Sequence, residues 1–145
     1  MKVAYRSQLL KFYLVYSFSD NAGGIALIMV SFNSIKLSLC NIYAPNNPND
    51  QLQFIQELNN CLIDKAELTR LIVGGDWNCT LTKKDKKGGL IWRPTNFRNA
   101  ILITMDIFDL IDIQRERHPN VNKYSYTSKA LNLEFKIKDR LFFNI

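Results

Sequence analysis

The feature that most restricts the fold of this sequence is a short apolar run, residues 69–74, which ends in glycine and leads through Gly75 into Asp76, Trp77 and Asn78. A run of this length bounded by glycines predicts a buried central strand. Because residues i and i+2 of an extended segment share a face, we expect Asp76 and Asn78 to lie side by side. Such a pair could orient and deprotonate a water molecule, or it could form a turn in which both side chains bind backbone groups.

A second polar segment also follows a predicted strand. Residues 35–43 alternate apolar and polar side chains, and residues 25–32 form an apolar run across a tight turn at Asn33-Ser34, so together they predict a hairpin. The strand ends at Tyr43, and Asn46 follows in a loop rich in Pro and Asn. Both side chains could donate hydrogen bonds to a phosphate oxygen, although Tyr43 could equally be an amphipathic side chain at a sheet edge.

Apolar residues at helical spacing predict two helices whose stripes belong to the core. The stripes are Leu52, Ile55, Leu58 and Leu62, which Asp50 could cap, and Phe97, Ile101, Met105 and Phe108. The first helix lies between the two polar segments, so both should end adjacent or nearby strands at one rim. Open α/β sheets bind ligands at that rim.

The remaining segments complete an α/β pattern. Residues 80–94 are polar and basic and contain glycine, which predicts an exposed loop. Residues 124–127 and 135–145 predict two closing strands, whereas residues 1–20 fit neither helical nor strand periodicity. The order strand, strand, helix, strand, helix, strand, strand predicts one α/β domain with a sizeable sheet.

The positive charge of the chain lies mainly in its second half. The net charge is +6, and five of these charges fall within residues 76–145. Residues 83–98 alone hold six basic side chains and one acid, with a run at Lys83, Lys84, Lys86 and Lys87. These lysines could contact phosphates beside a cleft, or they could belong to a solvated loop. Trp92 could stack on a base, but anchoring of the loop to the core is the favoured interpretation.

Cysteine usage and hydropathy indicate the compartment. The three cysteines stand at long spacings without a paired motif, which argues against a disulfide framework and favours a reducing environment. The apolar stretch near the N-terminus is interrupted by Lys11, so we predict neither a signal peptide nor a membrane span. We therefore expect an intracellular protein, nuclear or cytoplasmic, that is not secreted.

Residues 41–46 (Asn-Ile-Tyr-Ala-Pro-Asn) and 72–78 (Ile-Val-Gly-Gly-Asp-Trp-Asn) resemble the endonuclease/exonuclease/phosphatase superfamily. They are most similar to the apurinic-type endonuclease domain of LINE-type (non-LTR) retrotransposons. Weaker support comes from Trp92-Arg93-Pro94, Leu110-Ile111-Asp112-Ile113, His118-Pro119 and Tyr124-Ser125-Tyr126-Thr127. The resemblance runs in order over residues 23–145 as a partial domain and leaves residues 1–22 unassigned.

This resemblance implies a partial four-layer α/β sandwich of DNase I-like type, with two packed β-sheets flanked by helices. It also implies magnesium-dependent hydrolysis of DNA phosphodiester bonds, in a parent protein that nicks DNA for retrotransposition and is fused to a reverse transcriptase. By similarity, Asp76 would activate the attacking water and Asn78 would hold the same site by hydrogen bonding. Tyr43 would contact the scissile phosphate, and Asn46 would shape the pocket.

The sequence also departs from the family pattern. The family's metal-binding Glu has no counterpart, because no Glu precedes Glu57, and its Ser-Asp-His segment does not appear before Ile145. The sole histidine, His118, stands in a His-Pro turn and is expected at the surface. We therefore expect a domain truncated at both ends, weakly active or inactive, with unassigned metal ligands. The alternatives are a non-catalytic nucleic-acid-binding remnant and a phosphoesterase of the same superfamily.

Overall fold

The computed structural model describes residues 12–65, 70–88, 91–121, 126–130, 133–137 and 140–143. Its elements are β1 (Tyr13–Ser19), β2 (Ile25–Phe32), β3 (Ile35–Tyr43), α1 (Pro48–Lys65), β4 (Leu71–Asp76), the 3₁₀ turn η1 (Lys83–Asp85), α2 (Asn96–Ile107), β5 (Ile111–Asp112), α3 (Ile113–Arg117), β6 (Tyr126–Ala130), β7 (Leu133–Ile137) and β8 (Arg140–Phe143). In these described parts, no helix is long and apolar enough to span a membrane.

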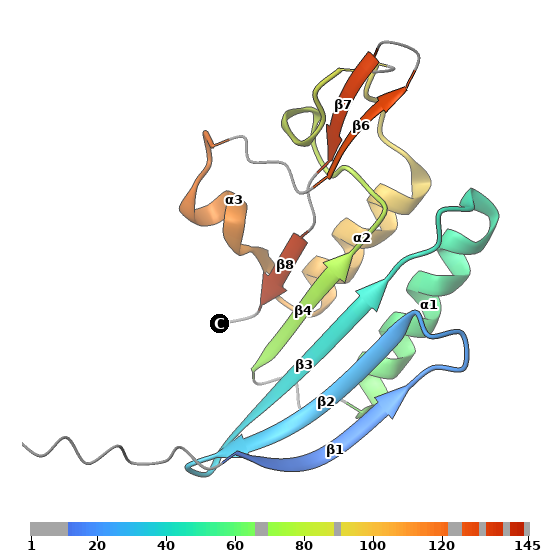
Figure 1. Cartoon of the computed structure of the whole chain (residues 1–145). Helices are drawn as coiled ribbons and strands as arrows, with labels where there is room; N and C mark the ends of the chain where they lie inside the picture. Colours follow the sequence, from blue (N-terminus) through green and yellow to red (C-terminus); the bar gives the residue numbers. More distant parts are fainter. Residues whose placement is uncertain are drawn as a thin grey trace, which may run out of the picture.

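One mixed sheet forms the centre of the molecule, in the strand order β1-β2-β3-β4-β8-β5 (Figure 1). Strands β1, β2 and β3 are antiparallel neighbours, and β3 and β4 run parallel because α1 returns the chain to the same end of the sheet. Strand β8 pairs antiparallel with β4 and with β5. Strands β6 and β7 form a separate antiparallel pair.

The turn between β2 and β3 confirms the predicted hairpin. Asn33 and Ser34 have φ values of 47° and 66°. Two consecutive residues of positive φ suit the mirror-image turns whose twist matches that of paired strands. Full pairing from Ile25 with Ile42 to Phe32 with Ile35 follows from this two-residue connection.

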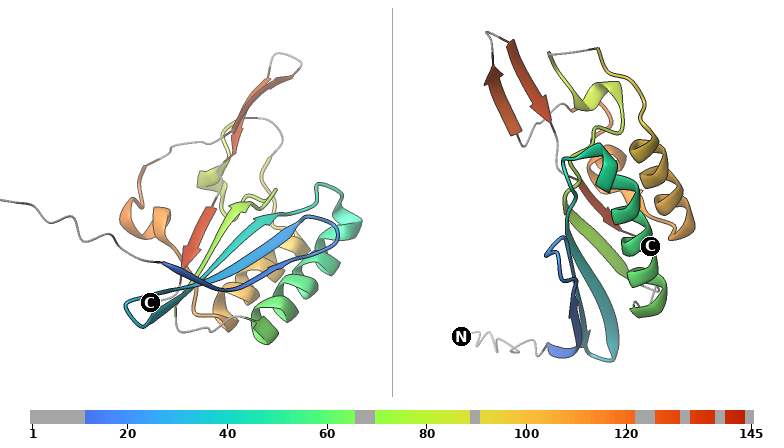
Figure 2. Two further views of the ribbon diagram at one scale, coloured as in Figure 1. Left: turned by 60° about the horizontal axis from the view of Figure 1, so that its bottom comes forward. Right: turned by 90° about the vertical axis from the view of Figure 1, so that its right-hand side faces the viewer.

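Helices α1 and α2 cover one face of the sheet (Figure 2). The core between these helices and the sheet is formed by alternate residues of the strands and by the inner stripes of the helices. Its buried residues include Ile25, Leu27, Cys40, Ile42, Phe54, Ile55, Leu58, Leu62, Leu71, Val73, Phe97 and Ile101. Alternation places Ile28, Leu39 and Ile72 on the opposite face, where no described helix lies.

The predicted α/β class is confirmed. The described residues supply one sheet and the helix layer that covers it. They do not form the second packed sheet that the resemblance implies, because the other strands, β6 and β7, form a two-stranded ribbon beyond the end of β4 (Figure 2).

Two details of the first helix differ from the prediction. Leu52 is 45% exposed, so its place in the core stripe was wrong. The helix begins at Pro48, and the backbone N–H of Asn49 donates to Asn47 Oδ1 at 3.1 Å. Asn47, rather than Asp50, therefore occupies the capping position.

The ends of the chain also differ from the prediction. Strand β1 comes from the segment whose periodicity was ambiguous, and it forms the edge of the sheet beside β2. Residues 135–145 contribute to two strands, β7 and β8, rather than to one. The short elements β5 and α3 had no prediction of their own. Such short segments are fixed by tertiary contacts rather than by a periodic pattern. The domain boundary at residue 23 stays a prediction.

Candidate functional site at the ends of β3 and β4

The two polar segments meet at one edge of the sheet, as predicted. In the parallel register, Tyr43 is the partner of Asp76. The pairing continues one step further, because the backbone N–H of Ala44 donates to the carbonyl oxygen of Asp76 at 2.8 Å. The polar ends of β3 and β4 therefore lie next to each other.

Gly75 permits this close approach. Its φ is +130°, and a Cβ atom at this position would lie 2.0 Å from the carbonyl oxygen of Ile42. No side chain fits at that separation, and L-residues rarely adopt this φ. The second glycine of the motif therefore serves the contact between the strand ends.

Asp76 and Asn78 come together by a different route from the predicted one. Strand β4 ends at Asp76, and Asn78 has a φ of 43°, so the chain turns instead of staying extended. Asp76 Oδ1 accepts the backbone N–H of Asn78 at 2.8 Å, which is an Asx turn. The expectation of a shared strand face was wrong, because local hydrogen bonding replaces the extended geometry.

Both side chains hold backbone groups and still present an oxygen atom. Asn78 Nδ2 donates to the carbonyl oxygen of Ala44 at 2.6 Å, which ties the turn to the end of β3. Asp76 Oδ2 and Asn78 Oδ1 accept no hydrogen bond from the described residues. As the turn interpretation predicted, one atom of each side chain, Asp76 Oδ1 and Asn78 Nδ2, binds a backbone group. The oxygen atoms Asp76 Oδ2 and Asn78 Oδ1 are open to a water molecule or a ligand.

Tyr43 lies on the helix-free side of this edge. Ile42, its neighbour, is 1% exposed beneath the helices, whereas Tyr43 is 58% exposed. Alternation therefore turns the Tyr43 ring away from the core. Asn46 is also exposed in the loop that follows. Trp77 is buried and anchors the turn between Asp76 and Asn78 in the core.

The basic segment comes shortly after the turn. Lys83, Lys84 and Lys87 are exposed, and Lys86 is partly so. The expected exposed loop over residues 80–94 was wrong in part, because Leu81 is 5% exposed and Asp85 is fully buried. Residues 80–88, which we call the lysine strip, are therefore structured: their lysines face solvent, whereas Leu81 and Asp85 face the protein.

Contacts from the following segment and from α2 hold the start of this strip. Trp92 Nε1 donates to the carbonyl oxygen of Thr80 at 3.2 Å, and Arg98 Nε donates to that of Leu81 at 2.6 Å. The Arg98 guanidinium also lies 5.6 Å from the centre of the Trp92 ring. Trp92 thus holds the segment by contacts with Thr80 and Arg98, whereas its predicted anchoring to the core stays a prediction.

The sequence did not predict the contact that holds the other end of the lysine strip. Asp85 Oδ1 lies 2.5 Å from Arg115 Nη2 on α3, and this carboxylate is 1% exposed. The available signal was the single acid within the basic stretch of residues 83–98. A buried charge is stable only when it is paired and hydrogen-bonded, so Asp85 is a structural centre of the strip.

His118 is the residue that follows α3, and its side chain is exposed, as predicted. Pro119 and Asn120, which directly follow it, form a turn. The structure therefore gives no reason to assign a catalytic role to His118.

Few described residues at the ends of β3 and β4 could bind magnesium. Among the described residues, no group of three or more His, Cys, Asp or Glu side chains could hold a metal ion. At the β3–β4 edge, Asp76 offers one carboxylate, with one of its oxygens already bonded to Asn78. Magnesium is usually bound by one or two carboxylates, with waters completing its octahedral shell, so Asp76 could supply one ligand of such a site.

Comparison with known proteins bears on this arrangement. No protein-family model matches the chain. The uncharacterized 149 kDa protein of transposon TX1 from Xenopus laevis is 29% identical over 92 residues, which cover 61% of this chain and 7% of that protein.

Solved structures match nearly the whole chain. The endonuclease domain of TRAS1, a telomere-specific non-LTR retrotransposon, superposes with a TM-score of 0.67 at 12% identity, over 93% of this chain and 56% of that one. An AP endonuclease from Archaeoglobus fulgidus gives 0.65 at 16% identity, over 94% and 60%. The chain has the DNase I-like fold. It spans little more than half of each of these two structures.

Proposed function

We propose that this chain is part of a DNA endonuclease domain of the retroelement type, with the phosphodiester placed at the joined ends of β3 and β4. The observation that carries the proposal is the register that pairs Tyr43 with Asp76 beside the exposed lysine strip. The similarity to a transposon protein and to a retrotransposon endonuclease domain supports the same assignment.

Each side chain has a defined task in this proposal. Asp76 Oδ2 accepts a proton from, or orients, the attacking water, because Oδ1 is held by the turn. Asn78 holds the turn and offers Oδ1 to the same water. Tyr43 donates its hydroxyl to a non-bridging phosphate oxygen, and Asn46 borders the pocket. Lys83, Lys84, Lys86 and Lys87 contact neighbouring phosphates of the DNA.

Magnesium is the cofactor that the family resemblance implies, and when bound it supplies Lewis-acid stabilisation of developing charge. Asp76 is the candidate ligand at this edge. Because the family's metal-binding Glu has no counterpart in the sequence before Glu57, we propose that this chain hydrolyses DNA weakly or not at all by itself. The parent protein, by analogy with retrotransposons, would carry a reverse transcriptase.

A plasmid-nicking assay in magnesium buffer tests the catalytic part. We expect little or no nicking above background, and binding of DNA that weakens with salt. The matched variants are Asp76→Asn, which keeps an acceptor for the Asn78 N–H, and Asp76→Ala, which removes it. Strong nicking by the unaltered chain that both variants abolish would contradict the proposed weak activity and confirm the role of Asp76. Absence of DNA binding at low salt would contradict the DNA partner itself.

A non-catalytic nucleic-acid-binding module is the second candidate. It is favoured by the hydrogen bonds that commit Asp76 Oδ1 and Asn78 Nδ2 to backbone groups. This function predicts that Asp76→Asn leaves DNA affinity unchanged and that neutralisation of the four lysines removes it. The endonuclease proposal instead requires Asp76→Asn to lower whatever nicking the chain shows.

A further inference from the structure

Asp85 is buried at the centre of the lysine strip, and its carboxylate accepts hydrogen bonds both from the strip and from α3. Oδ2 accepts the backbone N–H of Thr82 at 2.8 Å and the Thr82 hydroxyl at 2.7 Å. Oδ1 accepts from Arg115 Nη2. The residues on either side of Asp85 are lysines, of which Lys84 is exposed and Lys86 is partly exposed.

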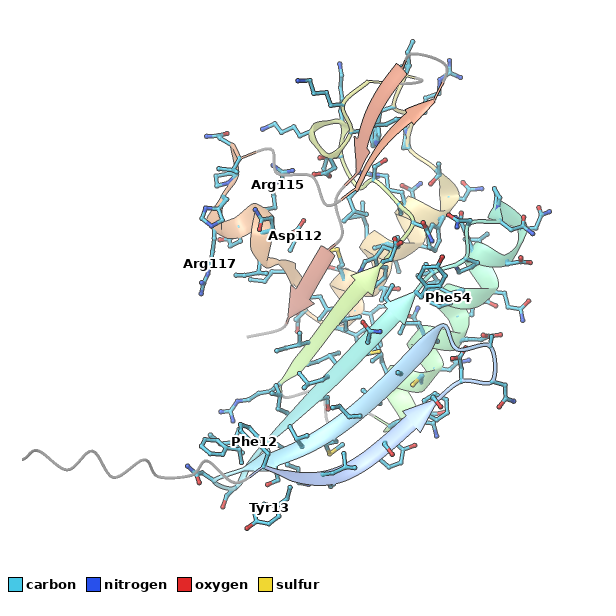
Figure 3. All side chains as sticks on the ribbon, in the orientation of Figure 1. Phe12, Tyr13, Phe54, Asp112, Arg115 and Arg117 are labelled. Carbon is cyan, nitrogen blue, oxygen red and sulfur yellow. The ribbon has the colours of Figure 1, made fainter. Side chains whose placement is uncertain are left out.

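Arg115 is itself held in place by α3. Its backbone N–H donates to Asp112 Oδ1 at 3.0 Å, and its Nη1 donates to the carbonyl oxygen of Pro119 at 2.8 Å. Figure 3 shows Arg115 and Asp112 on the inner side of α3, whereas Arg117 points away. The guanidinium therefore joins two segments that are 30 positions apart in the sequence.

We propose that Asp85 is a positioning residue for DNA binding: through Arg115 it fixes the lysine strip against α3, so that the strip meets DNA phosphates as a preformed surface. This inference rests on the proposed function. Preorganised cations lose less side-chain and backbone entropy when DNA binds, so they bind more tightly than the same cations on a loose segment.

The direction in which one mutation changes DNA affinity distinguishes a positioning role from a simple effect of charge. Asp85→Asn removes a negative charge from among four lysines, so electrostatic attraction alone predicts tighter DNA binding. Positioning predicts the opposite, because Asn keeps nearly the same shape but cannot pair as an anion with Arg115. A loss of affinity on removal of an acid is therefore diagnostic.

The experiment measures the affinity of the full chain for a short DNA duplex at fixed low salt, by fluorescence anisotropy. Asp85→Asn is expected to weaken binding on the order of tenfold, as lost preorganisation would. Glu116→Gln is the matched control, because it removes an exposed acid from α3 without touching the pair. It should leave affinity unchanged or slightly raise it. Tighter or unchanged binding by Asp85→Asn would overturn the proposal.

Two further measurements cover the case in which Asp85→Asn does not fold. Arg115→Lys keeps the charge but loses the planar fork, and it should also weaken binding while circular dichroism stays unchanged. Hydrogen exchange should speed up at the Thr82 amide in Arg115→Lys and stay slow in β3 and β4. Unchanged exchange and affinity in Arg115→Lys would contradict the proposal.

Failure of the proposed function gives a different result. If glutamine at all four lysine positions leaves DNA affinity unchanged, the strip does not contact DNA, and both the proposed contact and the role of Asp85 in binding fall together. If the lysines matter and Asp85→Asn binds more tightly, only the positioning role is wrong.

Discussion

Asn78 donates its side-chain amide to the carbonyl oxygen of Ala44 at 2.6 Å, and this bond joins the end of β4 to the end of β3 across 34 positions of the chain. The same residue adopts a φ of 43°, which Asn tolerates better than most L-residues. The Asn78 side chain therefore ties the turn to the end of β3 and aligns the two polar strand ends.

Replacement of Asn78 by alanine should destabilise the fold by about 1 to 3 kcal/mol, because a hydrogen bond is lost and alanine is strained at positive φ. The free energy of unfolding in urea measures this loss. Asn78→Gly is the control, since glycine accepts the φ without strain and lacks only the bond. Equal stability of the alanine and glycine variants would show that backbone strain contributes nothing here.

Gly75→Ala should be far more damaging, with a loss of about 3 kcal/mol or more, or a failure to fold. The new Cβ would meet the Ile42 carbonyl oxygen at 2.0 Å at a φ of +130°. Gly23→Ala is a matched control, because its φ is +74° and no atom lies within 4 Å of its added Cβ. It should cost about 1 kcal/mol. Thermal unfolding of the two variants checks the order, and equal losses would contradict the close contact.

The stability of the chain should fall at alkaline pH in part through Cys40. Burial raises the pKa of the Cys40 thiol from 9.0 to about 12, and the neighbouring Cys61 adds to the shift. Between these two pH values the unfolded thiol is ionised while the folded thiol keeps its proton. Stability from the neutral thiol is therefore complete below pH 9 and is lost as pH rises towards 12, by about 1.4 kcal/mol per pH unit.

Urea unfolding at pH 9 and at successive values above it measures this loss. Cys40→Ala has no thiol at this position, so its free energy of unfolding should fall less steeply over the same window. Parallel curves for the two proteins would show that Cys40 ionises alike in the folded and unfolded states.

The salt dependence of DNA binding should report the lysine strip. Glutamine at Lys83, Lys84, Lys86 and Lys87 should lower the slope of log affinity against log salt concentration by about 3 to 4, if each lysine meets one phosphate. Lys36→Gln is the control, because Lys36 lies at the start of β3, at the opposite end of the strand from Tyr43. A slope that does not change in the fourfold variant would place the DNA contact elsewhere.

Much of the site could be predicted because its elements are local. The alternation over residues 35–43, the apolar run before Gly75 and the helix between them were sufficient to place Tyr43 and Asp76 at the ends of adjacent or nearby strands, at one rim of the sheet. Their register and the roles of individual oxygens were not predictable, because these depend on where the chain turns after Asp76. Helix α1 shows the same limit, since Leu52 has helical spacing but is 45% exposed.

The sequence by itself determined the hairpin of β2 and β3, the placement of the ends of β3 and β4 at one rim of the sheet, and the presence of a carboxylate and an amide where β4 ends. These follow from short-range periodicity and turn chemistry. Only the tertiary structure decided that Asp85 is buried, since a lone acid among lysines reads as a solvated side chain. Its partner, Arg115, is 30 positions away, and the burial of a charge depends on whether a distant opposite charge is delivered to it.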